Sequence, residues 1–312
     1  MSSNSPTKTR FLILSDTHNI SLPPEYISNH DADVVIHCGD LTQSSMLDEL
    51  QASINFLQQI DAPLKLVIPG NHDFTLDTPF FRSMVEKDTA HLRPEAIAKA
   101  YGSYGEAKQL FMSPDAKAGG VRLLDEGTHH FTLRNGASLT VYASPYTPSL
   151  WNSGFQYKRS EGHHFEIQQN VDVAVTHGPP RGVMDLTASG QQAGCLELLA
   201  AVAHARPRMH CFGHIHEGWG AKLVTWEEKV GECSSPSVGI NEDRSVVIAS
   251  LSTLPSQGQG FYRTSHCERD EYPLVAGSQT LFVNAATVGL DEASVQPPWL
   301  VELELPLAKS LI

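Results

Sequence analysis

The sequence predicts an α/β fold in which parallel strands alternate with helices. Three short apolar runs, at 11–14, 33–37 and 64–68, each end in turn-forming or polar residues, as strands buried on both faces do. The second and third runs are separated by apolar residues at helical spacing: Met46, Leu47, Leu50, Ile54, Leu57 and Ile60. Because the strand, helix and strand follow one another closely, their connection should be a right-handed parallel crossover.

The rest of the chain continues this pattern with further strands and helices. Residues 78–113 are mostly helical in composition, and another helix is expected at 194–205. Residues 134–137 suit a hairpin turn, and 146–157 read as an irregular aromatic loop that packs rather than lines a pocket. Further strands are expected at 121–124, 130–133, 138–143, 171–175, 209–212, 223–226, 245–251, 281–283 and, as a terminal edge strand, 300–305. No repeat or low-complexity linker divides the chain, so we expect a single domain over 1–312.

Composition and charge restrict the partners and the compartment. The formal net charge is −13, which argues against long nucleic acids and anionic membranes as partners. A locally positive metal site still attracts a phosphate group. Five scattered cysteines without CxxC spacing favour a reduced, cytoplasmic protein. No signal peptide is recognisable, and no run approaches the ~20 apolar residues of a membrane span.

Polar side chains with metal-binding groups follow five of the predicted strands. They are Asp16, His18, Asp40, Asn71, His72, His177, His214 and His216. A single histidine after a strand is usually an ordinary loop or core residue, but recurrence at five strand ends favours a common site. The carboxyl ends of parallel strands meet at one edge of a sheet, where open α/β folds bind ligands. We therefore expect these side chains to converge.

These donors suit two divalent ions. Carboxylate, amide and imidazole groups without thiolate favour Mn, Fe, Zn or Mg over a structural zinc site. We predict that Asp40 bridges the ions, because one carboxylate can serve both. One shell would be completed by Asp16, His18 and His216, and the other by Asn71, His177 and His214. Such a site favours a small phosphoester substrate, attacked by a bridging hydroxide.

Three further residues are expected near the substrate. His72, next to the ligand Asn71, would bond a phosphoryl oxygen or protonate the leaving group. Asp73 would orient the His72 imidazole or, equally, cap the next segment as a turn residue. Asn71, His72 and Arg181 are the predicted substrate contacts. For Arg181, as for His163 and His164, the favoured alternative is a solvated loop residue.

The order and spacing of these blocks resemble the calcineurin-like metallophosphoesterases. The matching blocks are Asp16-x-His18, Gly39-Asp40, Gly70-Asn71-His72-Asp73, Thr176-His177 and Gly213-His214-x-His216. Within that superfamily, Thr-His-Gly-Pro-Pro and Gly-His-Ile-His-Glu-Gly resemble the metallophosphoesterase-domain-containing group, which is similar to class III cyclic nucleotide phosphodiesterases. The resemblance implies a four-layer αββα sandwich of two facing mixed sheets, the ligands above and His72 as the acid. It also implies activity on phosphodiesters, cyclic nucleotides included, with manganese preferred.

One segment departs from the family pattern. Residues 221–278 form a longer connection than expected, predicted to be a surface insertion rather than a cover over the pocket. Two alternatives to a phosphodiesterase stay open, a non-catalytic scaffold of the same fold and a phosphomonoesterase. Lost ligands would favour the scaffold, but every position is filled. The ligands themselves do not distinguish a monoester from a diester substrate.

Overall fold

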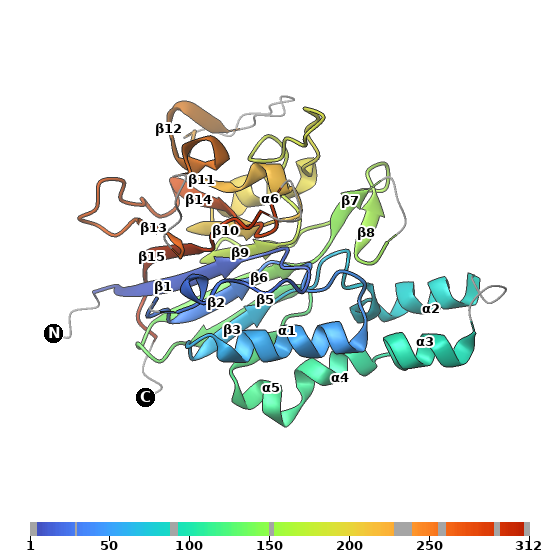
Figure 1. Ribbon diagram of the computed structural model, residues 1–312. Helices are drawn as coiled ribbons and strands as arrows, with labels where there is room; N and C mark the ends of the chain where they lie inside the picture. The colour runs from blue at the N-terminus through green and yellow to red at the C-terminus, as the bar shows by residue number, and fades with distance from the viewer. Residues whose placement is uncertain are drawn as a thin grey trace.

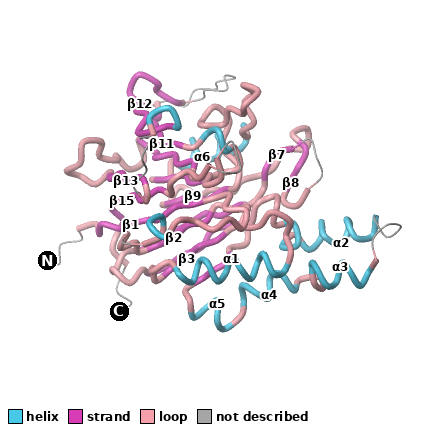
Figure 2. The backbone as a smooth tube through the Cα atoms, in the orientation of Figure 1, coloured by secondary structure: helices cyan, strands magenta, loops and turns pink. Residues whose placement is uncertain are grey.

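Two β-sheets face each other in the computed structural model, and helices cover their outer faces (Figure 1; Figure 2). The structure describes residues 5–28, 30–87, 93–149, 153–227, 239–254, 260–289 and 294–308. The sheets bring the carboxyl ends of their parallel strands to a common edge.

The first sheet contains the three strands predicted near the N-terminus. Its order is β13 (Tyr262–Ser265), β15 (Trp299–Leu305), β1 (Thr7–Leu14), β2 (Val34–His37), β3 (Leu64–Val67) and β4 (Val121–Leu123). The strands β1 to β4 are parallel, whereas β15 is antiparallel to β1. The prediction that β15 is an edge strand is wrong, because β13 pairs with its outer side.

The second sheet is also mixed. Its order is β12 (Ile240–Ser250), β11 (Gly220–Trp226), β14 (Gln279–Asn284), β10 (Met209–Phe212), β9 (Val173–Thr176), β6 (Ser138–Ser144) and β5 (Gly127–Thr132). The four strands β14, β10, β9 and β6 are parallel, and antiparallel strands flank them. The predicted hairpin between β5 and β6 is confirmed, with the Leu133 N–H donating to the Ala137 carbonyl.

The helices complete a four-layer sandwich. The first sheet is covered by α1 (Leu47–Gln59), α4 (Glu106–Met112) and α5 (Pro114–Ala118), and the second by α6 (Leu196–Ala205). The remaining helices, α2 (Thr78–Lys87) and α3 (Pro94–Tyr101), extend beyond the sheet (Figure 2). The predicted αββα architecture is confirmed.

Strand β1 shows why the layers form. Phe11 and Ile13 belong to the core between the two sheets, whereas Leu12 and Leu14 belong to the core beneath α1. Successive side chains of a strand point to opposite faces, so a continuous apolar run supplies both cores. A third core lies between the second sheet and α6 and includes Leu199.

Two further segments contribute strands, one of them predicted to be irregular and the other predicted to contain strands at 223–226 and 245–251. The predicted loop at 146–157 includes β7 (Thr147–Ser149) and β8 (Gln156–Lys158), which pair in parallel, so its description as irregular is wrong there. Trp151 and Asn152 lie outside the described residues. The segment 221–278 supplies most of β11 and all of β12 and β13, and thus strands to both sheets. Its status as an insertion stays a prediction.

Two observations concern the expected compartment. In the described ranges, no helix is both long and apolar enough to cross a lipid bilayer. Cys38, Cys195, Cys211 and Cys267 are free thiols, and Cys233 lies outside the described residues.

Candidate metal centre

The predicted donors lie where the two sheets meet. Asp16 and His18 follow β1, Asp40 follows β2, and Asn71 follows β3. From the second sheet, His177 follows β9, and both His214 and His216 follow β10. Apart from Asn71, their ligand atoms form groups in which all atoms lie within 4.8 Å of one another. The convergence expected from the strand ends is therefore present, while the role of each residue stays a prediction.

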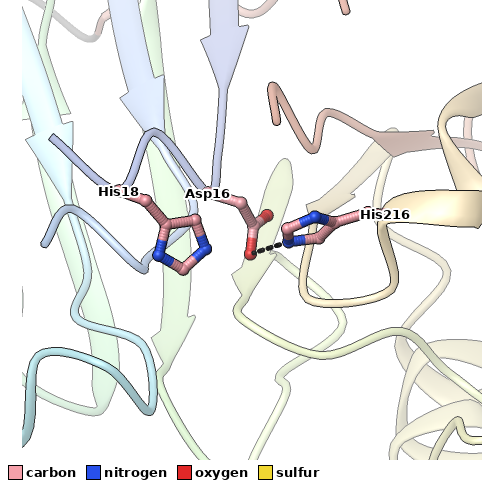
Figure 3. Close-up of side chains that lie close together, drawn as sticks. All are labelled: Asp16, His18 and His216. Atoms are coloured by element: carbon pink, nitrogen blue, oxygen red, sulfur yellow. Dashed lines mark ion pairs between the residues drawn. The ribbon is translucent and has the colours of Figure 1, made fainter. Parts of the chain in front are cut away.

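The first group consists of Asp16, His18 and His216 (Figure 3). The Nε2 atom of His216 lies 3.5 Å from Asp16 Oδ1, and the rings of His18 and His216 are 5.6 Å apart. The buried Asp16 carboxylate also accepts the backbone N–H of His214 at 3.0 Å. These three residues are the first predicted shell.

The second group consists of Asp40, His177 and His214. The Nε2 atom of His177 lies 3.3 Å from Asp40 Oδ2 and 3.1 Å from Asn71 Oδ1. The His177 and His214 rings are 4.9 Å apart. Asn71 is therefore next to this group. Together they contain the three ligands predicted for the second ion and Asp40, the predicted bridging carboxylate.

Asp40 connects the two groups. It also forms a third donor group with His18 and His72, and its Oδ2 lies 3.8 Å from His18 Nε2. The same oxygen is the one nearest to His177. The other oxygen, Oδ1, accepts the backbone N–H of His72 at 2.8 Å. A carboxylate shared between two sets of donors is the arrangement predicted for a bridging ligand.

Strained backbone conformations are concentrated at these donors. Among ten described non-glycine residues with positive φ, four are predicted ligands: Asp16, His18, Asp40 and His214. Such conformations cost free energy and persist where function or packing requires them. Asp16 at φ 53° and Asp40 at φ 52° turn sharply from the strand end, which directs the carboxylates toward the opposite sheet.

Glycines allow the loops to approach the carboxylates. A Cβ on Gly213 would lie 2.0 Å from Asp16 Oδ2, and one on Gly70 would lie 2.3 Å from Asp40 Oδ1. Both distances are far below van der Waals contact, so neither position has room for a side chain. The glycines of Gly-Asn-His-Asp and Gly-His-Ile-His therefore fit the centre tightly.

Charges within the cluster keep both carboxylates ionised. Burial opposes ionisation of Asp16, but His216 and the other histidines lower its pKa well below its ordinary value. Burial likewise opposes ionisation of Asp40, and His177 lowers its pKa to about 2. Burial lowers the pKa of His214 to about 4, so this imidazole is neutral and retains an electron pair. Ionised carboxylates and neutral imidazoles are the forms that bind metal ions, and Asp16, Asp40 and His214 are in those forms. Burial opposes protonation of His177, but the Asp40 carboxylate raises its pKa to about 9, so His177 has to release a proton when it binds an ion.

Backbone carbonyls orient two of the imidazoles. The Nδ1 atom of His177 lies 2.9 Å from the Cys38 carbonyl, and Nδ1 of His18 lies 3.2 Å from the Thr42 carbonyl. A carbonyl can only accept, so each Nδ1 carries the proton and Nε2 faces the cluster. Partners of this kind fix the tautomer of metal-binding histidines. The donor set therefore fits divalent ions.

His72 lies beside the cluster, held by Gln43. Its Nδ1 is 2.8 Å from the Gln43 carbonyl, and its ring is perpendicular to that of His18 at 4.7 Å. The ring is therefore held through Nδ1, and Nε2 is not needed to hold it. The position agrees with the predicted role as an acid, which stays a prediction.

Asp73 does not orient His72, and that prediction is wrong. Its buried carboxylate accepts the N–H of Leu41, the N–H and hydroxyl of Thr42, and the N–H of Gly70, at 2.7–3.1 Å. It therefore joins the loop after β2 to the loop after β3. Burial raises the pKa of this carboxyl to about 6. Neighbouring side chains in a tight turn point in different directions, which their adjacency in sequence does not show.

The remaining predicted contacts are not in the cluster. Among the described residues, no side-chain hydrogen bond or ion pair joins Arg181 to the donors, and its backbone N–H bonds the Cys195 carbonyl. His163 is not a solvated loop residue, because it bonds Glu126 at 2.7 Å and stacks on Tyr146 at 4.5 Å. His164 is 86% exposed, as a solvated residue would be.

The structure adds two residues that sequence reasoning did not assign to the site. Asn284 donates to the Ile215 carbonyl at 2.9 Å, and Gln296 donates to the His216 carbonyl at 3.3 Å. Both therefore hold the loop that carries His214 and His216. Asn284 could have been assigned to the site from the sequence, because it is a polar residue at the end of a predicted strand. Gln296 could not, because it lies in an irregular segment without such a pattern.

Two facing sheets with adjoining groups of oxygen and nitrogen donors at one edge agree with the metallophosphoesterase fold that the sequence resembles. The chain belongs to the calcineurin-like phosphoesterase family, which it matches over residues 9–218. Members of this family generally bind two divalent metals. The resemblance seen in the sequence is thereby confirmed.

Curated proteins similar to this chain include metallophosphoesterase domain-containing protein 1 of Homo sapiens, 32% identical over 226 residues and 69% of this chain. The Caenorhabditis elegans UPF0046 protein T07D4.2 is 32% identical over 73% of the chain. A protein named probable rhamnogalacturonate lyase C, from Emericella nidulans, is 34% identical over 70% of it. The chain spans 63%, 56% and 18% of these three proteins, respectively.

Proposed function

We propose that this protein is a dinuclear metal-dependent phosphodiesterase that acts on small phosphoesters, cyclic nucleotides among them. The observation that supports this most strongly is the position of the Asp40 carboxylate. It belongs to the group with His177 and His214, and its Oδ2 also lies 3.8 Å from Nε2 of His18 in the first group. Manganese is the proposed metal, with Fe, Zn or Mg as alternatives. Two such ions, when bound, supply Lewis acidity and a water molecule of lowered pKa.

The chain supplies the ligands in two sets. Asp16, His18 and His216 hold one ion, while Asn71, His177 and His214 hold the other. Asp40 is shared. Asn71 is neutral, so the second set carries little negative charge and a strong positive field faces the substrate. That field selects an anionic phosphoryl group.

His72 moves the proton in this proposal. Its Nδ1–H is held by the Gln43 carbonyl, which fixes the plane of the imidazole. In the protonated form, Nε2–H donates to a phosphoryl oxygen or to the oxygen of the leaving group. His72 is partly exposed, so solvent can return the proton after each turnover.

The overall charge supports a small substrate. A net charge of −13 repels long polyanions while leaving a single phosphoester free to reach the positive centre. Free cysteines at four described positions support the proposed cytoplasmic location. The scaffold alternative gains no support, because every predicted donor except the adjacent Asn71 belongs to one of the close groups.

The test is metal reconstitution followed by a substrate panel. Chelated protein is reloaded with Mn, Fe, Zn or Mg and assayed on bis-p-nitrophenyl phosphate, p-nitrophenyl phosphate, and 2′,3′- and 3′,5′-cyclic nucleotides. We expect two ions per chain and turnover that favours the diesters. Asp40→Asn should lose metal and activity, while Asp48→Asn, at an exposed aspartate of α1, should keep both. Metal-loaded protein inactive on the whole panel would refute the proposal.

A further inference from the structure

The imidazole of His72 is oriented by a backbone atom. Its Nδ1 lies 2.8 Å from the Gln43 carbonyl, while the Gln43 residue is otherwise exposed. Because the acceptor belongs to the backbone, its direction depends on the conformation of the loop after β2. The residues that fix this loop therefore determine how His72 is held.

Buried hydroxyl residues lie on both sides of Gln43. Thr42, which precedes it, donates to Asp73 at 2.7 Å and accepts the Ser45 N–H at 3.1 Å. Ser45, two residues after it, is fully buried and has a φ of 61°. This left-handed conformation is uncommon for a residue with a Cβ and costs free energy. Contacts with the surrounding chain have to maintain it.

Thr75 supplies these contacts. It lies in the short helix η2 (Phe74–Leu76), directly after the loop that carries His72. Its hydroxyl donates to the Ser45 carbonyl at 3.1 Å, and its backbone N–H donates to the Ser45 hydroxyl at 2.8 Å. The two hydroxyl oxygens are 2.7 Å apart. Since the Thr75 proton is used on the carbonyl, the Ser45 hydroxyl donates this third bond.

The loop is therefore fixed before and after the carbonyl that holds His72. Asp73 accepts from Leu41 and Thr42 before it, and Thr75 bonds Ser45 after it. Thr75 is only 1% exposed, so solvent does not readily replace its hydroxyl as a partner of Ser45. Buried donors and acceptors that lose their partner are destabilised, which favours rearrangement of the strained loop when the Thr75 hydroxyl is removed.

We infer that Thr75 is a positioning residue for His72, acting through Ser45 and the Gln43 carbonyl. The inference rests on the proposed function, in which Nε2–H of His72 donates to the leaving-group oxygen. With Nδ1–H bonded to the carbonyl, the plane and the tautomer of the ring are fixed. Without that bond, the neutral imidazole can carry its proton on either nitrogen, and the acid is correctly placed in fewer molecules.

The first measurement is independent of catalysis. The imidazole nitrogens of metal-free protein with isotope-labelled histidine are observed by NMR at a pH at which His72 is neutral. The His72 signals are identified by their absence in His72→Ala. We expect a single tautomer, protonated at Nδ1, in the wild type. Thr75→Val removes the hydroxyl and should give a mixture of tautomers, whereas Thr75→Ser keeps the hydroxyl and should retain the single tautomer.

The second measurement compares two esters in the manganese-loaded protein. The alkoxide that leaves a 2′,3′-cyclic nucleotide needs a proton, whereas p-nitrophenolate leaves bis-p-nitrophenyl phosphate as a stable anion. Thr75→Val should lower kcat on the cyclic nucleotide about tenfold with KM unchanged, which is part of the roughly 10²–10⁴-fold that a general acid contributes. On the nitrophenyl diester, kcat should fall less than about twofold. Thr75→Ser should restore turnover of the cyclic nucleotide.

Thr280 offers a matched control for the loss of a buried hydroxyl. It is fully buried near the start of β14, and its hydroxyl donates to the Pro207 carbonyl at 2.7 Å. The metal centre lies at the other end of this strand, where Asn284 bonds the Ile215 carbonyl. Thr280→Val should lower the urea midpoint but keep the His72 tautomer and the turnover of both esters.

A second variant covers the case in which the methyl group of valine, placed against the Ser45 carbonyl, prevents folding. Thr75→Ala removes the same hydroxyl without that methyl group, and we expect the same two changes from it. Urea unfolding and metal content verify that each variant is folded.

The outcomes separate this inference from the proposed function. A single Nδ1–H tautomer in the folded Thr75 variants, or equal losses of turnover on the two esters, would overturn the role of Thr75. The same changes in Thr280→Val would overturn it as well. Mixed tautomers in Thr75→Val, together with a wild type that hydrolyses no ester, would overturn the phosphodiesterase proposal and leave Thr75 as the residue that orients His72.

Discussion

Replacing His210 should make the protein less sensitive to acid. This residue of β10 is fully buried, with Nε2 at 2.8 Å from the Thr176 hydroxyl, and among the described residues Nδ1 has no hydrogen-bond partner. The rings of Phe212 and Phe282 lie 5.1 and 5.5 Å from its own. A charged imidazole in these surroundings would be poorly solvated, and burial lowers the pKa of His210 from 6.5 to about 3.

The sign and size of the effect follow from proton linkage. In the unfolded chain His210 becomes protonated below its ordinary pKa of 6.5. In the folded protein it becomes protonated only near pH 3. The contribution of neutral His210 to the free energy of unfolding is therefore fully present above pH 6.5, and it is lost as the pH falls toward 3. Each pH unit in this window is worth about 1.4 kcal/mol. Between pH 7.5 and 5.0, the proton that His210 binds only in the unfolded chain should lower the free energy of unfolding by about 2 kcal/mol.

The assay is urea unfolding of metal-free protein at a series of pH values. The variant His210→Leu, of similar volume, should lose about 2 kcal/mol less stability than wild type between pH 7.5 and 5.0. Contributions from the other buried histidines cancel in this comparison. His204→Leu, at an exposed position of α6, is the matched control and should follow the wild type. Parallel pH profiles for wild type and His210→Leu would refute the reasoning.

Three further predictions concern the metal centre. His72→Ala should leave both ions bound, by metal analysis, and lower kcat by about 10²–10⁴-fold; loss of metal instead would make His72 a ligand. Gly213→Ala should lower metal occupancy, because its Cβ would lie 2.0 Å from Asp16 Oδ2; full occupancy would show that the loop can move. Asp73→Asn should reduce the free energy of unfolding by roughly 2–4 kcal/mol, since the amide nitrogen cannot accept two of the present hydrogen bonds; an unchanged urea midpoint would contradict this.

The strands that carry the donors were predictable because they are buried on both faces. Continuous apolar runs such as 11–14, ending abruptly in polar residues, are a strong signal in a single sequence. Strand β13 has no such run: Tyr262, Arg263, Thr264 and Ser265 are all partly or largely exposed. It is held through its pairing with β15. The edge assignment of β15 failed for this reason.

Within the site, residue types were predictable but their directions were not. The donors could be identified from chemistry and from their places after strands. The contact that holds His72, however, is the backbone carbonyl of Gln43. Every residue has such a carbonyl, so the residue type at position 43 does not reveal the contact. Asp73 illustrates the same limit, because the N–H groups that it accepts from Leu41 and Gly70 are common to every ordinary residue.

Each set of proposed ligands draws on both sheets. Asp16 and His18 come from the first sheet and His216 from the second, and Asp40 likewise faces His177 across the interface. Bound ions would therefore cross-link two layers that are otherwise joined mainly by apolar packing. Any ligand that binds only the folded state adds to its stability in proportion to the logarithm of its concentration. Metal supply would then regulate how long the folded chain survives, in addition to whether it is active.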